Sequence, residues 1–235
     1  MEPLIIHETA DYIIIDKPSG WITNSASTTK GQPVVQDWLY DNFEYPIAKD
    51  KESRSGVVHR LDKETSGALI IAKTQNVFVY LQKQFKNRKV KKTYTLLAHG
   101  VVDPEVGNIV VPVGRLPWRK DRFGVLPGGR SAKTDYKVNE MYEKEGEKFS
   151  LLDAYPATGR THQLRIHFKH IGHPIVSDEF YAGRKTARSD RLWCPRLFLH
   201  AGSISFTDVS TSKKVIFSTD LPADLTKALK TINKI

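Results

Sequence analysis

The chain has 235 residues, of which 40% are hydrophobic, so a globular protein with a well-formed core is expected and disorder throughout the chain is excluded. Lys and Arg total 36 against 26 Asp and Glu, and the formal net charge of +10 favours a polyanionic partner such as nucleic acid. A protein that is simply basic explains the same charge equally well.

The sequence predicts a cytoplasmic protein without a membrane span. No window approaches 18 uninterrupted apolar residues. Residues 1–22 scatter acids among short apolar runs and lack the charged start and continuous apolar core of a signal peptide. Cys194 is the single cysteine and cannot form an internal disulfide, which fits a reducing compartment.

The first part of the chain alternates strand-like and helix-like patterns. The predicted elements are strands at 4–7 and 12–16, a helix over 34–43, a strand at 67–73, a helix over 75–88 and a strand at 93–100. Cations lie away from the apolar face of the second helix and continue beyond its end, at Lys83, Lys86, Arg88, Lys89, Lys91 and Lys92.

Residues 103–130 are rich in Gly, Pro and Arg, with aromatic residues interleaved, and predict a long basic loop or hairpin. This composition suits phosphate contacts and base stacking, although a solvated insertion also explains it. Strands are predicted at 133–142 and 148–157, then a helix over 158–172 with Thr161 as its cap and Gly172 as its end, then strands at 196–206 and 213–218 and a helix over 223–235.

The order of these elements predicts the fold class. No internal repeat, linker or change in composition divides the chain. We therefore expect one α+β domain over residues 1–235, with much antiparallel pairing.

Asp62 is the first candidate for chemistry, because it lies between Arg60 and Lys63 and directly before a Thr-Ser-Gly turn. The flanking cations favour its carboxylate form, which suits a nucleophile. The sequence "DKETSG" is also typical of a turn or a helix cap, so a purely structural acid remains an alternative.

The second candidate is the stretch "TGRTHQLRIH", which places Arg160 and Arg165 beside the start of a helix. Two arginines there suit a phosphate or a buried carboxylate, and surface salt bridges are the alternative. Four histidines at 162, 167, 170 and 173 lack zinc-ligand spacing, so we expect no metal site and assign them to RNA contacts, capping or packing.

Motifs for nucleotide-driven chemistry and serine hydrolysis are missing from the sequence. It contains no phosphate-binding G-x-x-x-x-G-K-[ST] loop, no G-x-G-x-x-G after a strand and no G-x-S-x-G elbow.

The segment "HRLDKETSGALIIAK" at 59–73 closely resembles the catalytic motif of RluA-family pseudouridine synthases, an H-R-L-D-x-x-T-S-G signature. Four further blocks agree in order and spacing: "KPSG" at 17–20, "KKTYTLLAHG" at 91–100, "TGRTHQLRIHFKHIGHPIVSDEFY" at 158–181 and "LFLHAGSISF" at 197–206. The resemblance covers almost the whole chain, from about Ile5 to Phe217.

The resemblance implies the catalytic fold of that family, a mixed and mostly antiparallel central sheet flanked by helices, with an active-site cleft across the sheet. It implies an isomerase that detaches uracil from its ribose in structured rRNA or tRNA, rotates it and rejoins it through carbon 5. No cofactor and no metal are implied.

The resemblance also implies roles for single residues. Asp62 matches the nucleophile, Tyr94 the tyrosine that packs against the base, and Arg165 the arginine that pairs with the catalytic carboxylate. The residues implied to bind substrate are His59, Arg60, Thr65, Arg160, His162 and Leu164. Of these, Leu164 matches the apolar lining of the uracil site, and Arg60 the residue that enters the RNA stack when the base flips out.

Two departures from the family pattern affect what can be carried over. Many relatives have a histidine where this chain has Asn24, so a role for that position is not carried over. The catalytic pattern starts within the first few residues, so we expect the catalytic domain alone, acting as a monomer without an obligate protein partner. RNA affinity would then come from the basic stretches 83–92 and 115–130.

Two other functions remain as alternatives. An RNA-binding or RNA-folding protein of the same fold would need none of Asp62, Tyr94 and Arg165, so their joint presence favours the enzyme. A metal-dependent nuclease would require a carboxylate cluster for Mg²⁺, which the sequence does not show.

Overall fold

The computed structural model describes residues 1–117 and 119–235, without the side chains of Lys120 and Asp121. Trp118, part of the predicted basic hairpin, lies outside the described residues. The chain forms two compact units: unit 1 comprises residues 1–92 and 201–220, and unit 2 comprises residues 93–200 and 221–235. The single catalytic domain over 1–235 stays a prediction.

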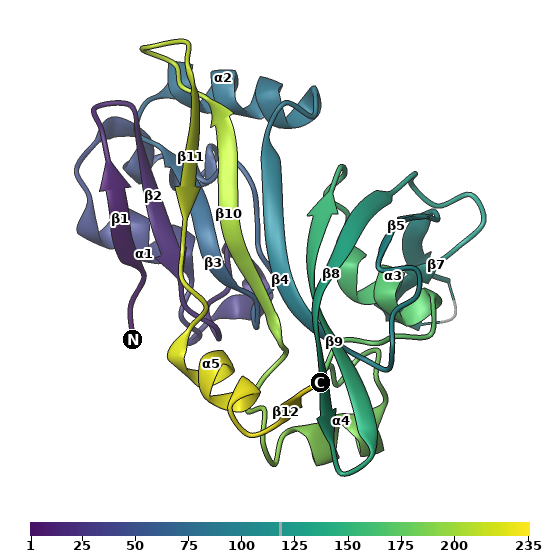
Figure 1. The fold of residues 1–235 in the computed structure, drawn as a ribbon. Helices are drawn as coiled ribbons and strands as arrows, with labels where there is room; N and C mark the ends of the chain where they lie inside the picture. Colours follow the sequence, from purple (N-terminus) through teal and green to yellow (C-terminus); the bar gives the residue numbers. More distant parts are fainter. Residues whose placement is uncertain (118) are drawn as a thin grey trace. The chain divides into compact units, whose positions relative to one another are not determined.

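Unit 1 is built on antiparallel strands, as expected from the short apolar runs. Its strands are β1 (Leu4–Glu8), β2 (Tyr12–Lys17), β3 (Ser66–Ala72), β10 (Leu199–Thr207) and β11 (Lys214–Ser218). They follow the order β1-β2-β3-β10, with β11 paired to β10 (Figure 1). The predicted hairpin at 4–7 and 12–16 is confirmed by the antiparallel pairing of β1 with β2.

The core of unit 1 lies between these strands and helix α2 (Gln75–Lys86). Every residue of β3 is buried, and Ile70 of that strand packs with Val77, Phe78 and Leu81 of the helix. Thr74 caps the helix by accepting a hydrogen bond from the backbone nitrogen of Val77 at 3.4 Å. Helix α1 (Val35–Asn42) and short 3-10 helices at 27–29, 46–49 and 54–56 complete the unit.

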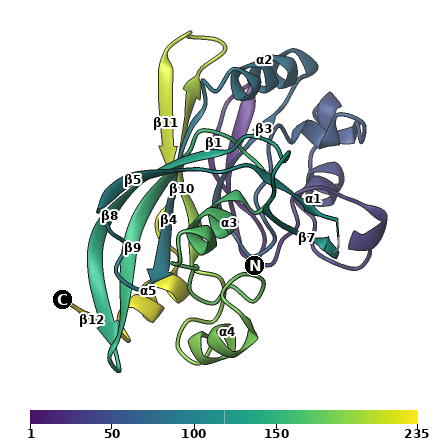
Figure 2. The same ribbon diagram turned by 90° about the vertical axis from the view of Figure 1, so that its right-hand side faces the viewer.

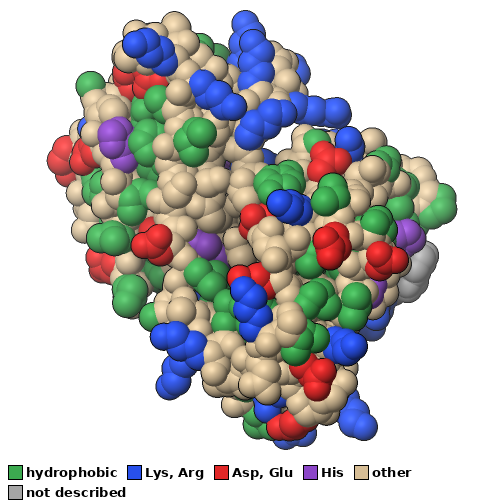
Figure 3. Space-filling view, viewed as in Figure 1, with side chains coloured by type: hydrophobic (Ala, Val, Ile, Leu, Met, Phe, Trp, Pro, Cys, Tyr) green, Lys and Arg blue, Asp and Glu red, His purple; other side chains and the backbone are tan. Residues whose placement is uncertain are grey.

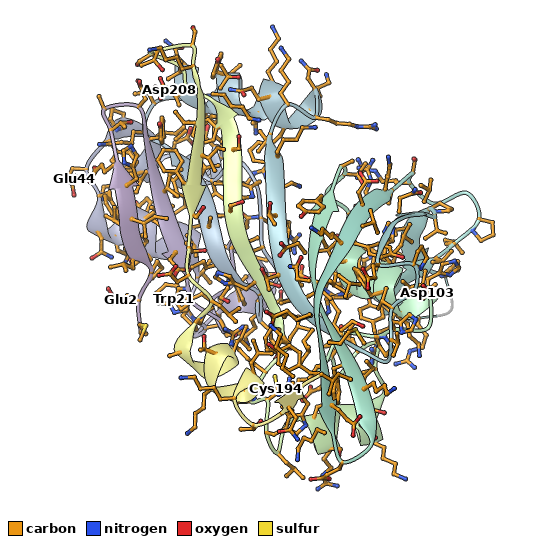
Figure 4. All side chains as sticks on the ribbon, viewed as in Figure 1. Glu2, Trp21, Glu44, Asp103, Cys194 and Asp208 are labelled. Atoms are coloured by element: carbon orange, nitrogen blue, oxygen red, sulfur yellow. The ribbon has the colours of Figure 1, made fainter. Side chains whose placement is uncertain are left out.

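The turn between β10 and β11 is tied back to β2. Asp208, labelled at this turn in Figure 4, accepts a 2.8 Å hydrogen bond from the hydroxyl of Tyr12. Burial and this acid together raise the pKa of Tyr12 well above its ordinary value. The bond therefore links positions 196 residues apart in the sequence.

Unit 2 carries the second set of strands. They are β4 (Lys91–His99), β5 (Val106–Val110), β8 (Lys133–Lys144), β9 (Glu147–Pro156) and β12 (Asn233–Lys234). The order is β4-β9-β8-β12, with β5 paired to β8. The predicted strands at 133–142 and 148–157 are confirmed as β8 and β9.

Within the Gly-, Pro- and Arg-rich residues 103–130, a separate two-stranded hairpin is formed by β6 (Val113–Leu116) and β7 (Arg119–Val125), and we call it the basic hairpin. Helix α3 (Gln163–His170) contacts both β7 and β9, as Figure 2 shows. Two further helices, α4 (Arg184–Asp190) and α5 (Ala223–Leu229), belong to this unit.

Three local predictions were wrong. Helix α3 begins at Gln163 rather than near Thr161, because His162 takes a left-handed conformation (φ 55°) and the Gln163 side chain accepts hydrogen bonds from Thr158 and Arg160. The C-terminal helix ends at Leu229, since residues 233 and 234 pair with β8. Helix α4 was not predicted.

The α+β class and the mostly antiparallel sheet are confirmed, while the cleft across the sheet stays a prediction. Within the described part of the chain, no helix has the length and apolar character needed to span a membrane.

Gly67, the second residue of β3, occupies a position that admits no side chain. Its φ is +118°, and a Cβ atom there would lie 2.3 Å from the carbonyl oxygen of Ala201. The start of β3 therefore approaches β10 as closely as a glycine allows.

We expect Gly67→Ala to destabilise the protein more than Gly31→Ala does. Gly31 also has a positive φ (+74°), but nothing lies within 4 Å of its Cβ position, so only the backbone cost of roughly 1–2 kcal/mol applies. The contact with Ala201 should add about 1–3 kcal/mol at Gly67. Chemical denaturation of both variants tests this, and equal free energies of unfolding would contradict the close approach.

Candidate active site

The nine predicted site residues fall into two groups, one in each unit. Unit 1 holds His59, Arg60, Asp62 and Thr65 on one short segment. Unit 2 holds Tyr94, Arg160, His162, Leu164 and Arg165. Each group is described below within its own unit.

The segment 59–65 combines an exposed cation with a half-buried acid. Arg60 is exposed, Asp62 is partly exposed and Thr65 is buried. The Asp62 carbonyl accepts a 3.1 Å hydrogen bond from the Thr65 nitrogen, so the predicted turn is present. The backbone at Asp62 thus follows the turn that its sequence predicts.

Thr23 holds the residue directly before Asp62. Its buried hydroxyl donates to the carbonyl of Leu61 at 2.7 Å and accepts from the Leu61 nitrogen at 3.1 Å. Ile22, the residue before Thr23, forms backbone hydrogen bonds with Pro33 and with Val35, the first residue of helix α1. The backbone in front of Asp62 is therefore anchored to a helix.

Lys17, Ser19 and Gly20 bind the main chain that follows Asp62. The Lys17 side chain is fully buried, and its ammonium donates to the carbonyls of Pro18 (3.0 Å), Trp21 (2.8 Å) and Lys63 (3.3 Å). The Lys63 carbonyl also accepts from the Gly20 nitrogen at 2.8 Å. The Ser19 hydroxyl donates to the Glu64 carbonyl at 2.9 Å.

Taken together, residues 17–23 bind the main chain on both sides of Asp62. We call this set of contacts, made by Lys17, Ser19, Gly20 and Thr23, the loop clamp. Most of its bonds go to main-chain groups, so they fix the direction in which the Asp62 side chain leaves the backbone without using its carboxylate.

His59 packs as a neutral ring. Its Nε2 atom accepts a 3.1 Å hydrogen bond from the Ile70 nitrogen, and the ring stacks on Phe85 at a centroid distance of 4.7 Å. Burial, with the Lys92 charge nearby, lowers the pKa of His59 to about 3. His59 thus links the Asp62 segment to β3 and α2, and its predicted contact with substrate stays a prediction.

In unit 2, Tyr94 and Leu164 offer buried apolar surface. Tyr94 lies on β4 opposite Ala154 of β9, and 9% of its surface is exposed. Leu164 lies in the first turn of α3 with 6% exposed. Both suit contacts with the face of a base.

Arg165 forms a buried, two-pronged ion pair with Asp178. Its Nε and Nη2 atoms each donate to a carboxylate oxygen of Asp178 at 2.8 Å. The same carboxylate accepts from the backbone nitrogens of Phe180 and Tyr181, whose rings lie 5.2 and 5.1 Å from the guanidinium. Arg165 is therefore held rigidly inside unit 2.

Arg160 and His162 connect the residues before α3 to Ser131 and to Tyr181. The Arg160 side chain donates to the Ser131 carbonyl at 3.1 Å. His162 Nδ1 lies 2.9 Å from the Tyr181 hydroxyl, which donates to the Phe123 carbonyl at 3.1 Å. Their predicted contacts with substrate stay predictions.

Three supporting residues escaped the reading of the sequence. Lys17 lay within the quoted "KPSG" block, but no role was assigned to it. Thr23 carried no signal at all. Asp178 could have been sought, because a buried arginine near a helix start requires an acid and "HPIVSDEFY" offers one a short distance along the chain.

Comparisons with known proteins place these residues in context. A family model described as RNA pseudouridylate synthase matches residues 11–170. An uncharacterized RNA pseudouridine synthase of Mycobacterium bovis is 33% identical over 226 residues, covering 96% of this chain and 71% of the relative. A ribosomal large subunit pseudouridine synthase D of Nitrosomonas europaea is 31% identical over 234 residues, covering 98% of this chain and 65% of the relative.

A further relative, an uncharacterized RNA pseudouridine synthase of Aquifex aeolicus, is 37% identical over 183 residues, which are 78% of this chain and 57% of that protein. The chain thus spans between 57% and 71% of the length of these relatives.

Solved structures share the fold. Human RNA Pseudouridylate Synthase Domain Containing 1 matches with a TM-score of 0.71 and 23% identity, covering 99% of this chain and 89% of that one. Human RNA Pseudouridylate Synthase Domain Containing 4 also gives a TM-score of 0.71, at 21% identity, covering 98% of this chain and 94% of the other. The predicted fold is confirmed by both.

We expect Thr23→Val to destabilise the protein by about 1–3 kcal/mol, because it leaves both main-chain groups of Leu61 buried without the Thr23 hydroxyl. Thr23→Ser keeps the hydroxyl and should recover most of this loss. Urea denaturation of the three proteins gives the free energies of unfolding. If the valine variant were as stable as the wild type, the hydroxyl would not hold Leu61.

Stability should fall in mild acid because His59 and His167 both have lowered pKa values, and the contribution of His167, which is fully buried in α3, can be tested separately. Burial lowers the pKa of His167 from an ordinary 6.5 to about 4, although a contact with the Val111 backbone acts in the opposite direction. Between these values the unfolded chain binds a proton that the folded chain does not. Stability is therefore complete above pH 6.5 and declines toward pH 4, by up to about 3 kcal/mol.

The test compares unfolding free energies of wild type, His167→Leu and His170→Gln at several pH values from 7 to 4. His170 lies on the same helix but is exposed. Only the His167 variant should lose a large part of the decline, and an unchanged slope in that variant would show that another group is responsible.

Proposed function

Because the chain belongs to the RNA pseudouridylate synthase family and is an RNA-modifying isomerase, we propose that it converts a uridine of structured RNA into pseudouridine with Asp62 as the nucleophile. The observation that carries the role of Asp62 is the loop clamp. A partly exposed carboxylate on a backbone fixed on both sides is suited to attack a bound substrate.

The reaction balances without an external reagent. The bond from uracil N1 to the ribose C1′ breaks and a bond from C5 to C1′ forms, while C5 loses a proton and N1 gains one. A carboxylate can open this sequence by adding to C1′ of the ribose or to C6 of the base. Both routes use the same residue, and neither consumes a nucleotide or changes the oxidation state.

We propose that Arg165 pairs with Asp62 during the reaction. Asp178 and the two aromatic rings hold the guanidinium in one orientation, so it can meet a second carboxylate without a further loss of side-chain freedom. Tyr94 and Leu164 then pack against the uracil, and Tyr94 is the candidate to take the proton from C5.

The uridine has to leave its helix or loop to reach Asp62, so base flipping is part of the proposal. Arg60 supports this step, because it is exposed and only two residues from Asp62. Its guanidinium can fill the gap in the RNA stack and pair with phosphates there.

Ribosomal RNA is the first candidate substrate and transfer RNA the second. Relatives of this chain include proteins named ribosomal large subunit pseudouridine synthase D. The basic stretch at the end of α2 supplies a surface for the RNA backbone: Lys83, Lys86, Arg88, Lys89 and Lys91 are all exposed. Figure 3 shows Lys and Arg side chains gathered over that helix.

We further propose that the protein works in the cytoplasm as a monomer, without a protein partner, cofactor or metal. The single cysteine fits a reducing compartment, and rRNA and tRNA are found there in bulk. The isomerisation itself requires no group beyond the side chains named above.

We expect Asp62→Asn to lower the rate of pseudouridine formation by at least about a thousandfold, because the amide cannot act as the nucleophile. RNA affinity should change little. Glu64→Gln is the matched control, since it removes one negative charge from the same turn and should keep most of the activity.

The measurement uses total rRNA and tRNA transcribed in vitro, with nucleoside mass spectrometry for the product and filter binding for affinity. Full activity in Asp62→Asn would exclude Asp62 as the nucleophile. A wild-type protein that binds RNA tightly but forms no pseudouridine would favour the alternative, an RNA-binding or RNA-folding protein.

A further inference from the structure

A pocket in unit 2 borders the surroundings of Arg165, because Phe180 and Tyr181, whose rings contact Arg165, also line the pocket. It is an open pocket with a volume of about 510 Å³, bordered by the hairpin β6–β7, helix α3 and residues 179–184. Tyr94, Leu164 and Arg165 are not among its lining residues. The volume is within the range of sites for small ligands.

The pocket combines an apolar floor with a cationic rim. Leu116, Phe123, Val125 and Ile166 supply apolar surface. The rim residues that carry or can carry positive charge are Arg119, Arg122, Lys169, His170 and Arg184. Among the described residues that line the pocket, Glu179 is the one acid, and Arg191 lies 3.1 Å from its carboxylate.

The walls are held together by specific contacts. Arg122 of the hairpin donates to the Phe180 carbonyl at 2.9 Å and lies 4.3 Å from the centre of the Phe180 ring. The Tyr181 hydroxyl donates to the carbonyl of Phe123, which also lies on β7. These bonds fasten β7 to the segment 179–184, so the pocket exists before any ligand arrives.

Helix α3 presents different residues to the two sites. Leu164 and Arg165 belong to the proposed active site, whereas Ile166, Lys169 and His170 line the pocket. The spacing of three and four residues places the second set on one face of the helix. The pocket and the proposed contacts with the target uridine therefore use different residues of α3.

We propose that this pocket binds a single nucleotide of the RNA substrate other than the target uridine, with its base on the apolar floor and its phosphate at Lys169 and Arg184. The proposal rests on the proposed function for the identity of the RNA. A nucleotide matches both features, since it joins a planar, largely apolar face to an anion.

The test compares two neutralised neighbours, Arg184→Gln and Lys185→Gln. Both side chains are exposed on α4, and both substitutions remove one positive charge, but only Arg184 lines the pocket. Binding of in-vitro-transcribed rRNA and tRNA is measured by filter binding between 50 and 200 mM salt. A second arm measures binding of free UMP by ligand-observed NMR, because a free nucleotide has the same chemistry.

Arg184→Gln should weaken RNA binding about three- to tenfold at low salt and reduce the slope of log affinity against log salt by roughly one. Lys185→Gln should change both much less. Equal effects of the two substitutions would mean that only the general positive field matters, which overturns the proposal.

Loss of UMP binding in Arg184→Gln, with RNA binding equal to that of Lys185→Gln, would assign the pocket to a free nucleotide and overturn the RNA assignment. Absence of pseudouridine formation by the wild type would refute the proposed function instead. The two failures are distinguishable, because RNA affinity is measured without reference to product.

Discussion

The buried ammonium of Lys17 is the constraint on which the Asp62 segment depends. A charge removed from water is tolerated only where polar groups replace its hydration, and three main-chain carbonyls do so here. Two of them belong to the turn that follows β2, and the third is that of Lys63, next to Asp62. Satisfying one cation thus brings two segments 46 residues apart into fixed contact.

Arg165 follows the same logic with a different partner. Its buried guanidinium is matched by the carboxylate of Asp178, which in turn accepts two backbone N–H groups. The pairing with Asp178 means that the guanidinium is not left as an uncompensated buried cation. Buried polar contacts thus hold both the backbone around Asp62 and the side chain of Arg165.

The parts of the fold that the sequence predicted are those set by local pattern. β8, β9 and α2 follow the period of their apolar residues, and the contiguous motif around Asp62 marks the candidate nucleophile. The bond of Thr23 to Leu61 joins positions 38 residues apart, and that of Arg165 to Asp178 joins positions 13 residues apart. The period of apolar residues along the sequence does not predict such pairs. The predicted start of α3 was wrong for a related reason. The turn before the helix is held by the Gln163 side chain, which accepts hydrogen bonds from Thr158 and Arg160, and not by Thr161.

Phe180 connects the pocket to the surroundings of the proposed catalytic arginine. Arg122, on the rim of the pocket, lies 4.3 Å from the ring centre, and Arg165 lies 5.2 Å from it. The backbone of Phe180 is also bonded to both Arg122 and Asp178. Any ligand that shifts Arg122 therefore acts on the ring and the main chain that position Arg165. The proposed nucleotide site and the side chain proposed to pair with Asp62 therefore share the contacts of Phe180.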